Sequence, residues 1–132
     1  MMLEDVRQLI KSFGLAEHVY KGMMDHKKEK SFGVYHSKHR QPYKTAIGGP
    51  TLESYGTKRI TILVHWNKSP DDTEKASNEL FEAIIRVRDI SINETKIKFI
   101  QLLCDEPISV DTDENGIYEM VIEAAVVYEK GR

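Results

Sequence analysis

The chain has 132 residues, of which 40% are hydrophobic and 30% are charged. This length suits one domain with its own core, and the hydrophobic content is too high for a disordered tail. With 19 basic and 21 acidic residues, the chain lacks the basic excess of a dedicated duplex-binding protein.

The first predicted element is a helix over residues 3–13, which ends at Gly14. Its apolar residues recur at the spacing of one helix face, at Leu3, Val6, Ile10 and Phe13. Two short strands are predicted at 19–24 and 31–36, and the polar connection 25–30 has the length of a hairpin loop. We therefore predict that these two strands pair as a hairpin.

The clearest strand covers residues 59–67, after a stretch that prolines and glycines interrupt. That stretch, 37–58, is predicted to be a long exposed loop, with a brief strand at 45–47. Strand 59–67 points alternate residues toward one face that we predict to be core, at Ile60, Ile62, Val64 and Trp66. His65 lies on the opposite face, where we expect it to be half-exposed or hydrogen-bonded to a neighbour.

A second helix is predicted to begin at Ser69, which caps it, with Pro70 at the first helical position. Its expected buried stripe consists of Ala76, Leu80, Ala83, Ile84 and Val87. Strands at 96–104 and 117–129 complete the chain, and Glu119 and Glu123 give the second of them one wet face. We predict a single α+β domain over 1–132 with two layers. In it, two helices pack on one face of a largely antiparallel sheet, because this arrangement buries both helix stripes.

Catalytic and metal-binding signals are weak in this sequence. Residues 111–116 match the first half of a calcium loop, but Ile122 replaces the closing carboxylate, so we interpret them as a strand-to-strand turn. The five histidines lack zinc-ligand spacing, and no nucleophile or phosphate-binding motif occurs. We therefore predict a protein that is not an enzyme and has no catalytic residue, metal or cofactor. A small metal-dependent enzyme using Asp111, Asp113 and His65 stays open as an alternative.

Charge is distributed unevenly along the chain. Residues 21–44 contain seven basic side chains and residues 105–119 contain six acidic ones. Both segments can be solvated loops, or the basic patch of one subunit can meet the acidic patch of the next in a closed ring. The basic segment can also face passing DNA without sequence selectivity. No apolar segment reaches the length of a membrane span, so we expect no membrane contact.

Five stretches that span nearly the whole chain carry a resemblance to a known family: residues 15–22, 27–35, 46–49, 63–67 and 113–119. In them the sequence resembles the minor capsid and tail-terminator proteins of siphophages and prophages. The resemblance implies a structural virion protein, assembled in the host cytoplasm as a homo-oligomeric ring, commonly a hexamer. Such a ring contacts the tail tube protein and the head connector proteins. A head-completion or connector adaptor protein and a small nucleic-acid-binding module stay open as alternatives.

A specific subunit contact needs roughly 800 Å² per partner, which is more than loop charges alone supply. We therefore expect apolar and aromatic side chains to anchor the interface, with charged side chains orienting the partners. The candidate interface residues are Lys27, Lys28, Lys30, Tyr43, Ile47, Leu52, Tyr55, Asp111, Asp113 and Glu114.

Overall fold

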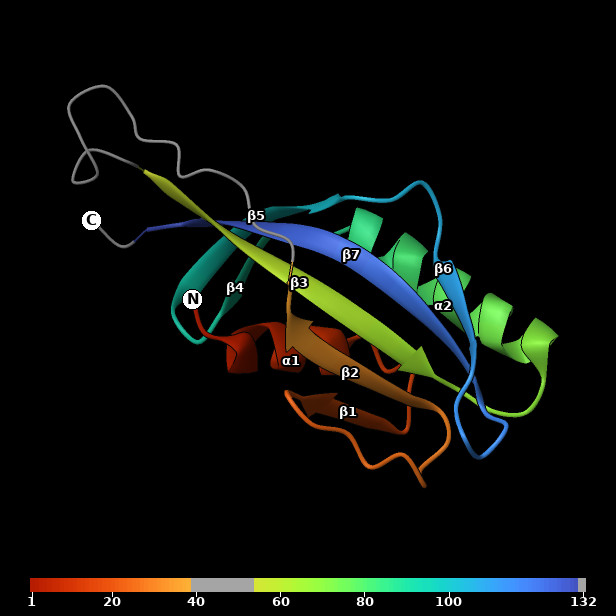
Figure 1. Cartoon of the computed structure of the whole chain (residues 1–132). Coiled ribbons are helices and arrows are strands. Elements are labelled where there is room, and N and C mark those ends of the chain that lie inside the picture. Colours follow the sequence, from red (N-terminus) through yellow and green to blue (C-terminus); the bar gives the residue numbers. More distant parts are fainter. Residues whose placement is uncertain (39–53, 131–132) are drawn as a thin grey trace.

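The computed structural model describes residues 1–38 and 54–130, and all statements below refer to these residues (Figure 1). The helices are α1 (Leu3–Ser12) and α2 (Pro70–Ile85). The strands are β1 (His18–Lys21), β2 (Ser31–His36), β3 (Tyr55–His65), β4 (Arg88–Ile92), β5 (Thr95–Leu102), β6 (Ile108–Thr112) and β7 (Tyr118–Glu129). In these described ranges, neither helix is long and apolar enough to cross a membrane.

The strands form one mixed sheet in the order β1-β2-β3-β7-β5-β4, with β6 paired to β7 beside this path. The long strands β3 and β7 pair antiparallel at its centre, from Tyr55 opposite Glu129 to His65 opposite Glu119 (Figure 1). Because β3 occupies one side of β7 along this length, β5 and β6 share the other side. The predicted α+β class is confirmed, with two helices and a seven-stranded sheet in the described chain.

The predicted hairpin of the first two strands is wrong, because β1 and β2 pair in parallel, with His18 opposite Ser31 and Lys21 opposite Val34. The chain enters β1 beside the start of β2, where the Glu17 N–H donates to the Lys30 carbonyl. Residues 22–30 therefore cannot turn back directly. They return along the length of the strands to the end of the sheet where β3 ends.

Two strands were missing from the sequence prediction. Strand β4 forms a tight hairpin with β5 through Asn93 and Glu94, both of which have positive φ. Such turns usually contain glycine, so the turn signal was absent here. Strand β6 is short, fully exposed and irregular, with Asp111 at φ 65°. The predicted loop 37–58 is also too long, because β3 already begins at Tyr55, and the predicted strand 45–47 lies outside the described residues.

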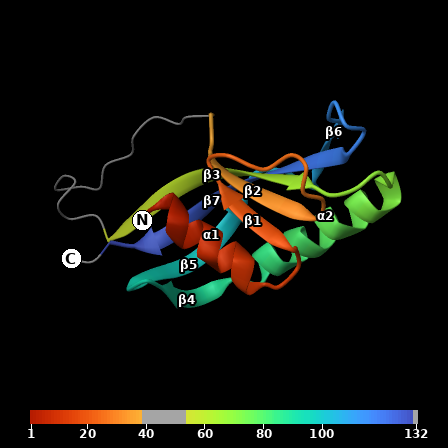
Figure 2. The ribbon, with the colours of Figure 1, turned by 90° about the horizontal axis from the view of Figure 1, so that it is seen from below.

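Apolar residues of both helices pack against the sheet. Helix α1 contacts β1, β2 and β4, and α2 contacts β3, β5 and β7 (Figure 2). The core cluster comprises Val6, Leu9, Ile10, Phe32, Val34, Ile60, Ile62, Val64, Leu80, Ile84, Val87, Ile97, Ile100, Ile122, Ala124 and Val126. The predicted core face of β3 is thus confirmed, except that Trp66 is only partly buried. That both helices cover one face stays a prediction.

The predicted start of the second helix is confirmed in detail. The Ser69 side chain accepts a hydrogen bond from the Asp72 N–H at 3.2 Å, and Pro70 is the first helical residue. This cap satisfies one of the unpaired N–H groups that every helix has at its start. It also fixes where the chain turns from the end of β3 into α2.

Candidate functional site

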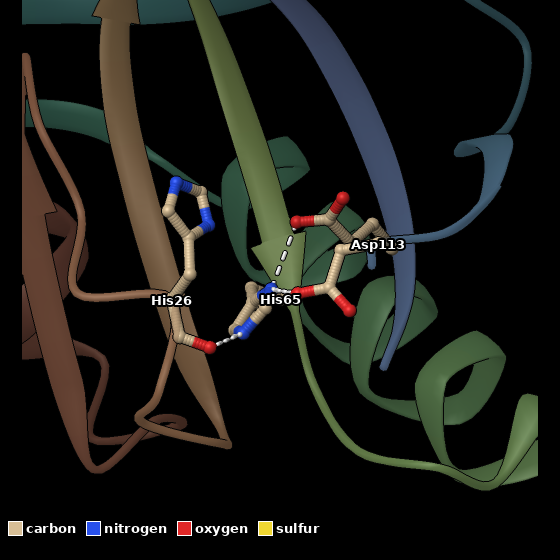
Figure 3. Close-up of side chains that lie close together, drawn as sticks. His26, His65 and Asp113 are labelled. Atoms are coloured by element: carbon tan, nitrogen blue, oxygen red, sulfur yellow. Dashed lines mark hydrogen bonds and ion pairs between the residues drawn. The ribbon is translucent and has the colours of Figure 1, made fainter. Parts of the chain in front are cut away.

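Four ionisable side chains converge where β3 ends and β7 begins: His26, His65, Asp113 and Glu119. Each offers one nitrogen or oxygen atom, and these four atoms all lie within 4.8 Å of one another. Figure 3 shows His26, His65 and Asp113 approaching from different segments of the chain. This group, called the His65 cluster below, gathers histidine and carboxylate side chains that could hold a metal ion.

The fold explains how each member reaches the cluster. His65 and Glu119 are opposed in the β3–β7 register, which brings their side chains to one face of the sheet. Asp113 comes from the turn between β6 and β7. His26 comes from the 22–30 connection, which reaches this end of the sheet because β2 begins here, with Ser31 opposite His65.

His65 is fully buried, and both ring nitrogens have oxygen partners. Nε2 lies 2.9 Å from the His26 backbone oxygen, and Nδ1 lies 2.8 Å from a Glu119 carboxylate oxygen (Figure 3). The prediction that His65 is hydrogen-bonded to a neighbour is therefore confirmed. Because a carbonyl only accepts, Nε2 must carry a proton, and Nδ1 then faces the carboxylates.

Asp113 uses its two oxygens differently. Oδ1 accepts backbone N–H groups from Asn115 at 2.9 Å and Ile117 at 3.0 Å, which closes the turn that the sequence predicted. Oδ2 is buried without a hydrogen-bond partner and lies 3.8 Å from His65 Nδ1. Buried polar atoms normally have a partner, so this oxygen marks an incomplete arrangement.

The His65 cluster gathers acidic groups around one imidazole nitrogen. The Asp113 and Glu119 carboxyl groups converge on Nδ1, and burial makes a nearby positive charge favourable there. Burial and the nearby Glu119 charge also raise the pKa of Tyr35 above its usual range.

The predicted interface residues divide between two ends of the molecule. Lys27, Lys28 and Lys30 are exposed in the 22–30 connection, close to His65, and Asp111 and Glu114 are exposed around the β6–β7 turn. Tyr55 is 53% exposed at the opposite end of β3. The remaining candidates, Tyr43, Ile47 and Leu52, lie outside the described residues.

Sequence reasoning found only half of the His65 cluster. It paired His65 with Asp113 in a metal hypothesis, and the structure brings these two together, but Asp111 stays exposed on β6. It missed His26 and Glu119, because residues so far apart in sequence show no ligand spacing. The register of β3 with β7 is the signal that would have found Glu119.

Two further surfaces are accessible. All five residues of β6 are exposed, including Ile108 at 47% and Val110 at 44%. A groove of about 960 Å³ runs between the end of α1 and α2, with apolar lining from Phe13, Leu15, Ala83, Val87 and Ile90. Acidic side chains of α2 line the same groove, among them Asp71, Glu74, Glu79 and Glu82.

Comparison with known proteins gives one family. The model of a family described as bacteriophage tail terminator protein matches residues 9–130, which include every strand and α2. No curated protein matches the chain significantly. The resemblance drawn from the sequence is confirmed by this match over nearly the whole chain, and the chain therefore belongs to the bacteriophage tail terminator protein family.

Proposed function

We propose that the protein assembles as a homo-oligomeric ring of six subunits that completes the phage tail at the head–tail junction. Family membership makes the chain a structural component of the virion, in a family of tail proteins rather than enzymes. The ring, its number and its position are what the sequence resemblance implies. The proposed partners are the tail tube protein and the head connector proteins, and the proposed place of assembly is the host cytoplasm.

The exposed edge strand β6 is the observation that carries this proposal. Within the described chain, β6 pairs with β7 alone, and it presents Ile108 and Val110 to solvent. An apolar edge strand is a template for pairing with another chain unless it is covered. A neighbouring subunit that covers β6 removes this liability.

In this proposal, β6 of one subunit pairs with strand β1 of the next subunit. One row of paired residues crosses the sheet here through Val19, Phe32, Val64, Met120 and Ser109. Strand β1 is therefore at one end of the row and β6 at the other. Contact between two different edges is head-to-tail, and it closes into a ring when the rotation per subunit permits.

Exposed charges of both signs lie at this end of the sheet. Asp111 and Glu114 are exposed around the β6–β7 turn, and Lys27, Lys28 and Lys30 are exposed in the 22–30 connection. These charges orient an approaching subunit in the proposed ring. In this proposal Asp113 supports the β6–β7 turn, and Tyr55 stays a candidate anchor together with Tyr43, Ile47 and Leu52.

The test compares the parent chain with two variants by sedimentation velocity over a concentration series. The Ile108→Lys, Val110→Lys double variant places two charges on the edge, and we expect a folded monomer where the parent forms a ring. The matched control is Ile85→Lys, because Ile85 on α2 is also 47% exposed. It should assemble like the parent. Identical distributions for all three proteins would remove β6 from the interface.

A head-completion or adaptor role differs in what its loss does to the particle. Without a terminator, tail tubes lack a cap, so electron microscopy of particles made without this protein should show tubes of irregular length and no joined heads. Normal tails beside heads that have lost their DNA would instead assign the protein to head completion.

A further inference from the structure

We propose that His26, His65, Asp113 and Glu119 bind one divalent transition-metal cation of the zinc class. The four ligand atoms, two imidazole nitrogens and two carboxylate oxygens, already lie within 4.8 Å of one another. Zinc and related ions typically bind four ligands, and they accept both imidazole nitrogens and carboxylate oxygens.

The hydrogen bonds around the cluster orient two of its four ligand groups, His65 and Asp113, toward each other. Nε2–H of His65 donates to the His26 carbonyl, which leaves the Nδ1 lone pair directed at the carboxylates. Asp113 Oδ1 is held by two backbone N–H groups, which leaves Oδ2 directed at His65. Metal ligands in proteins are usually held by outer contacts of this kind.

The unpartnered oxygen of Asp113 is the second observation that points to a cation. The Asp113 side chain is only 12% exposed, and its Oδ2 atom is buried without a hydrogen-bond partner. Among the residues that the structure describes, the ion-pair partner of both Asp113 and Glu119 is His65. One imidazole balances two carboxylates incompletely even when it is protonated, whereas a dication balances both.

The separations between His65 and the two carboxylates need only a small adjustment, and the His26 ring, which is exposed, has room to approach from the 4.8 Å limit. Ligand atoms about 2.0 to 2.2 Å from a tetrahedral ion are roughly 3.3 to 3.6 Å apart. His65 Nδ1 lies 3.8 Å from Asp113 Oδ2 and 2.8 Å from Glu119 Oε2. The Glu119 carboxylate must therefore move away from Nδ1 by less than about 1 Å, which a side-chain rotation supplies.

Access and consequence both follow from the position of the cluster. His26 is exposed, and Glu119 lines a cleft of about 370 Å³ between α2 and β6, so an ion can enter from solvent.

A bound ion would link four segments of the chain: the 22–30 connection, β3, the β6–β7 turn and β7. It stabilises the folded chain over the unfolded one, since the ligands converge only on folding. This effect does not depend on ring assembly.

The experiment uses the full chain without a histidine tag, treated with chelator and then titrated with Zn²⁺ by calorimetry. We expect one ion per chain and a higher melting temperature with Zn²⁺. Ca²⁺ should leave the melting temperature unchanged, because imidazole nitrogens are poor calcium ligands and the Asp111 loop lacks its closing carboxylate. Co²⁺ in place of Zn²⁺ should give the visible absorption of a four-coordinate site.

Two variants decide the result. His26→Ala removes an exposed ligand without emptying the core, and we expect Zn²⁺ affinity to fall by about tenfold or more. His36→Ala removes an exposed histidine outside the cluster and should bind like the parent. Absence of stoichiometric binding, or equal losses in both variants, would overturn the proposal.

Discussion

The alternation of apolar residues predicted correctly that Trp66 faces the core, but the structure buries this side chain only in part. Its ring stacks on Phe32 with 5.8 Å between the ring centroids, at the margin of the core. Its backbone N–H donates to the Tyr118 carbonyl, and its carbonyl accepts from the Lys30 N–H. Trp66 therefore connects β3, the start of β7 and the end of the 22–30 connection.

Truncation of Trp66 to Ala should lower the free energy of unfolding by about 2 to 4 kcal/mol, somewhat below the loss at a fully buried aromatic position. Urea unfolding of the parent and the variant measures this difference. Trp66→Phe, which keeps an aromatic ring against Phe32, should recover much of the loss. A variant as stable as the parent would show that the stacking contributes nothing.

Residues whose role depends on their own strand were predictable, and residues whose role depends on a distant segment were not. Alternation placed Ile60, Ile62 and Val64 correctly because the pleat fixes which face each side chain takes. His65 was expected to be half-exposed or hydrogen-bonded, yet its full burial depends on the 22–30 connection and the β6–β7 turn. Local pattern carries no information about those covering segments.

At the scale of elements, one carboxylate links α1 to the edge strand β1 beside their apolar contact. Glu4 accepts hydrogen bonds from Arg7 at 2.8 and 2.7 Å and pairs with Lys21 of β1 at 3.0 Å. Arg7 also reaches the Val19 carbonyl at 3.4 Å. The hydrogen bonds from Arg7, and then those from Gln8 and Lys21, hold the Glu4 pKa well below its usual range.

This lowered pKa predicts a pH dependence of stability. Glu4 binds its proton more weakly in the folded state, so its contribution is complete above the ordinary value of 4.5 and is lost as the pH falls toward the lowered pKa. Urea unfolding between pH 2 and 7 should show Glu4→Gln less stable than the parent at neutral pH, with the gap narrowing in acid. Glu79→Gln, at an exposed position of α2, serves as the control. A constant gap across the range would contradict the assignment.

Pairing direction was the element-level property that the sequence could not supply. The polar connection 25–30 has a length that fits a hairpin, but length does not specify where the chain enters β1. That point is set by the contact of Glu17 with Lys30 and by the packing of α1 on β1 and β2. Strand β4 escaped prediction for a different reason, because Asn93 and Glu94 adopt positive φ without a glycine.

At the scale of the whole molecule, exposed basic and acidic residues gather at one end of the sheet, in the 22–30 connection and around the β6–β7 turn. If these charges orient approaching subunits, reversing Lys27, Lys28 and Lys30 to Glu should slow ring formation, most strongly at low salt, where screening is weakest. Time-resolved light scattering at low and high salt measures the rate. Replacement of three exposed basic residues outside this connection, Lys68, Lys75 and Arg86, by Glu is the matched control. Equal rates for the parent and both variants would exclude steering by this connection.

The central β3–β7 pairing also determines when during synthesis the fold can form. Tyr55 must find Glu129, and β7 follows every other described strand in the chain. During translation, β2 and β3 therefore leave the ribosome well before β7, which pairs with the other side of β3. Until β7 emerges, the nascent chain exposes a long hydrophobic edge that includes Ile60, Ile62 and Val64, and such edges attract other chains. The interval between translation of β3 and β7 is thus the period in which the nascent chain is most open to pairing with other chains.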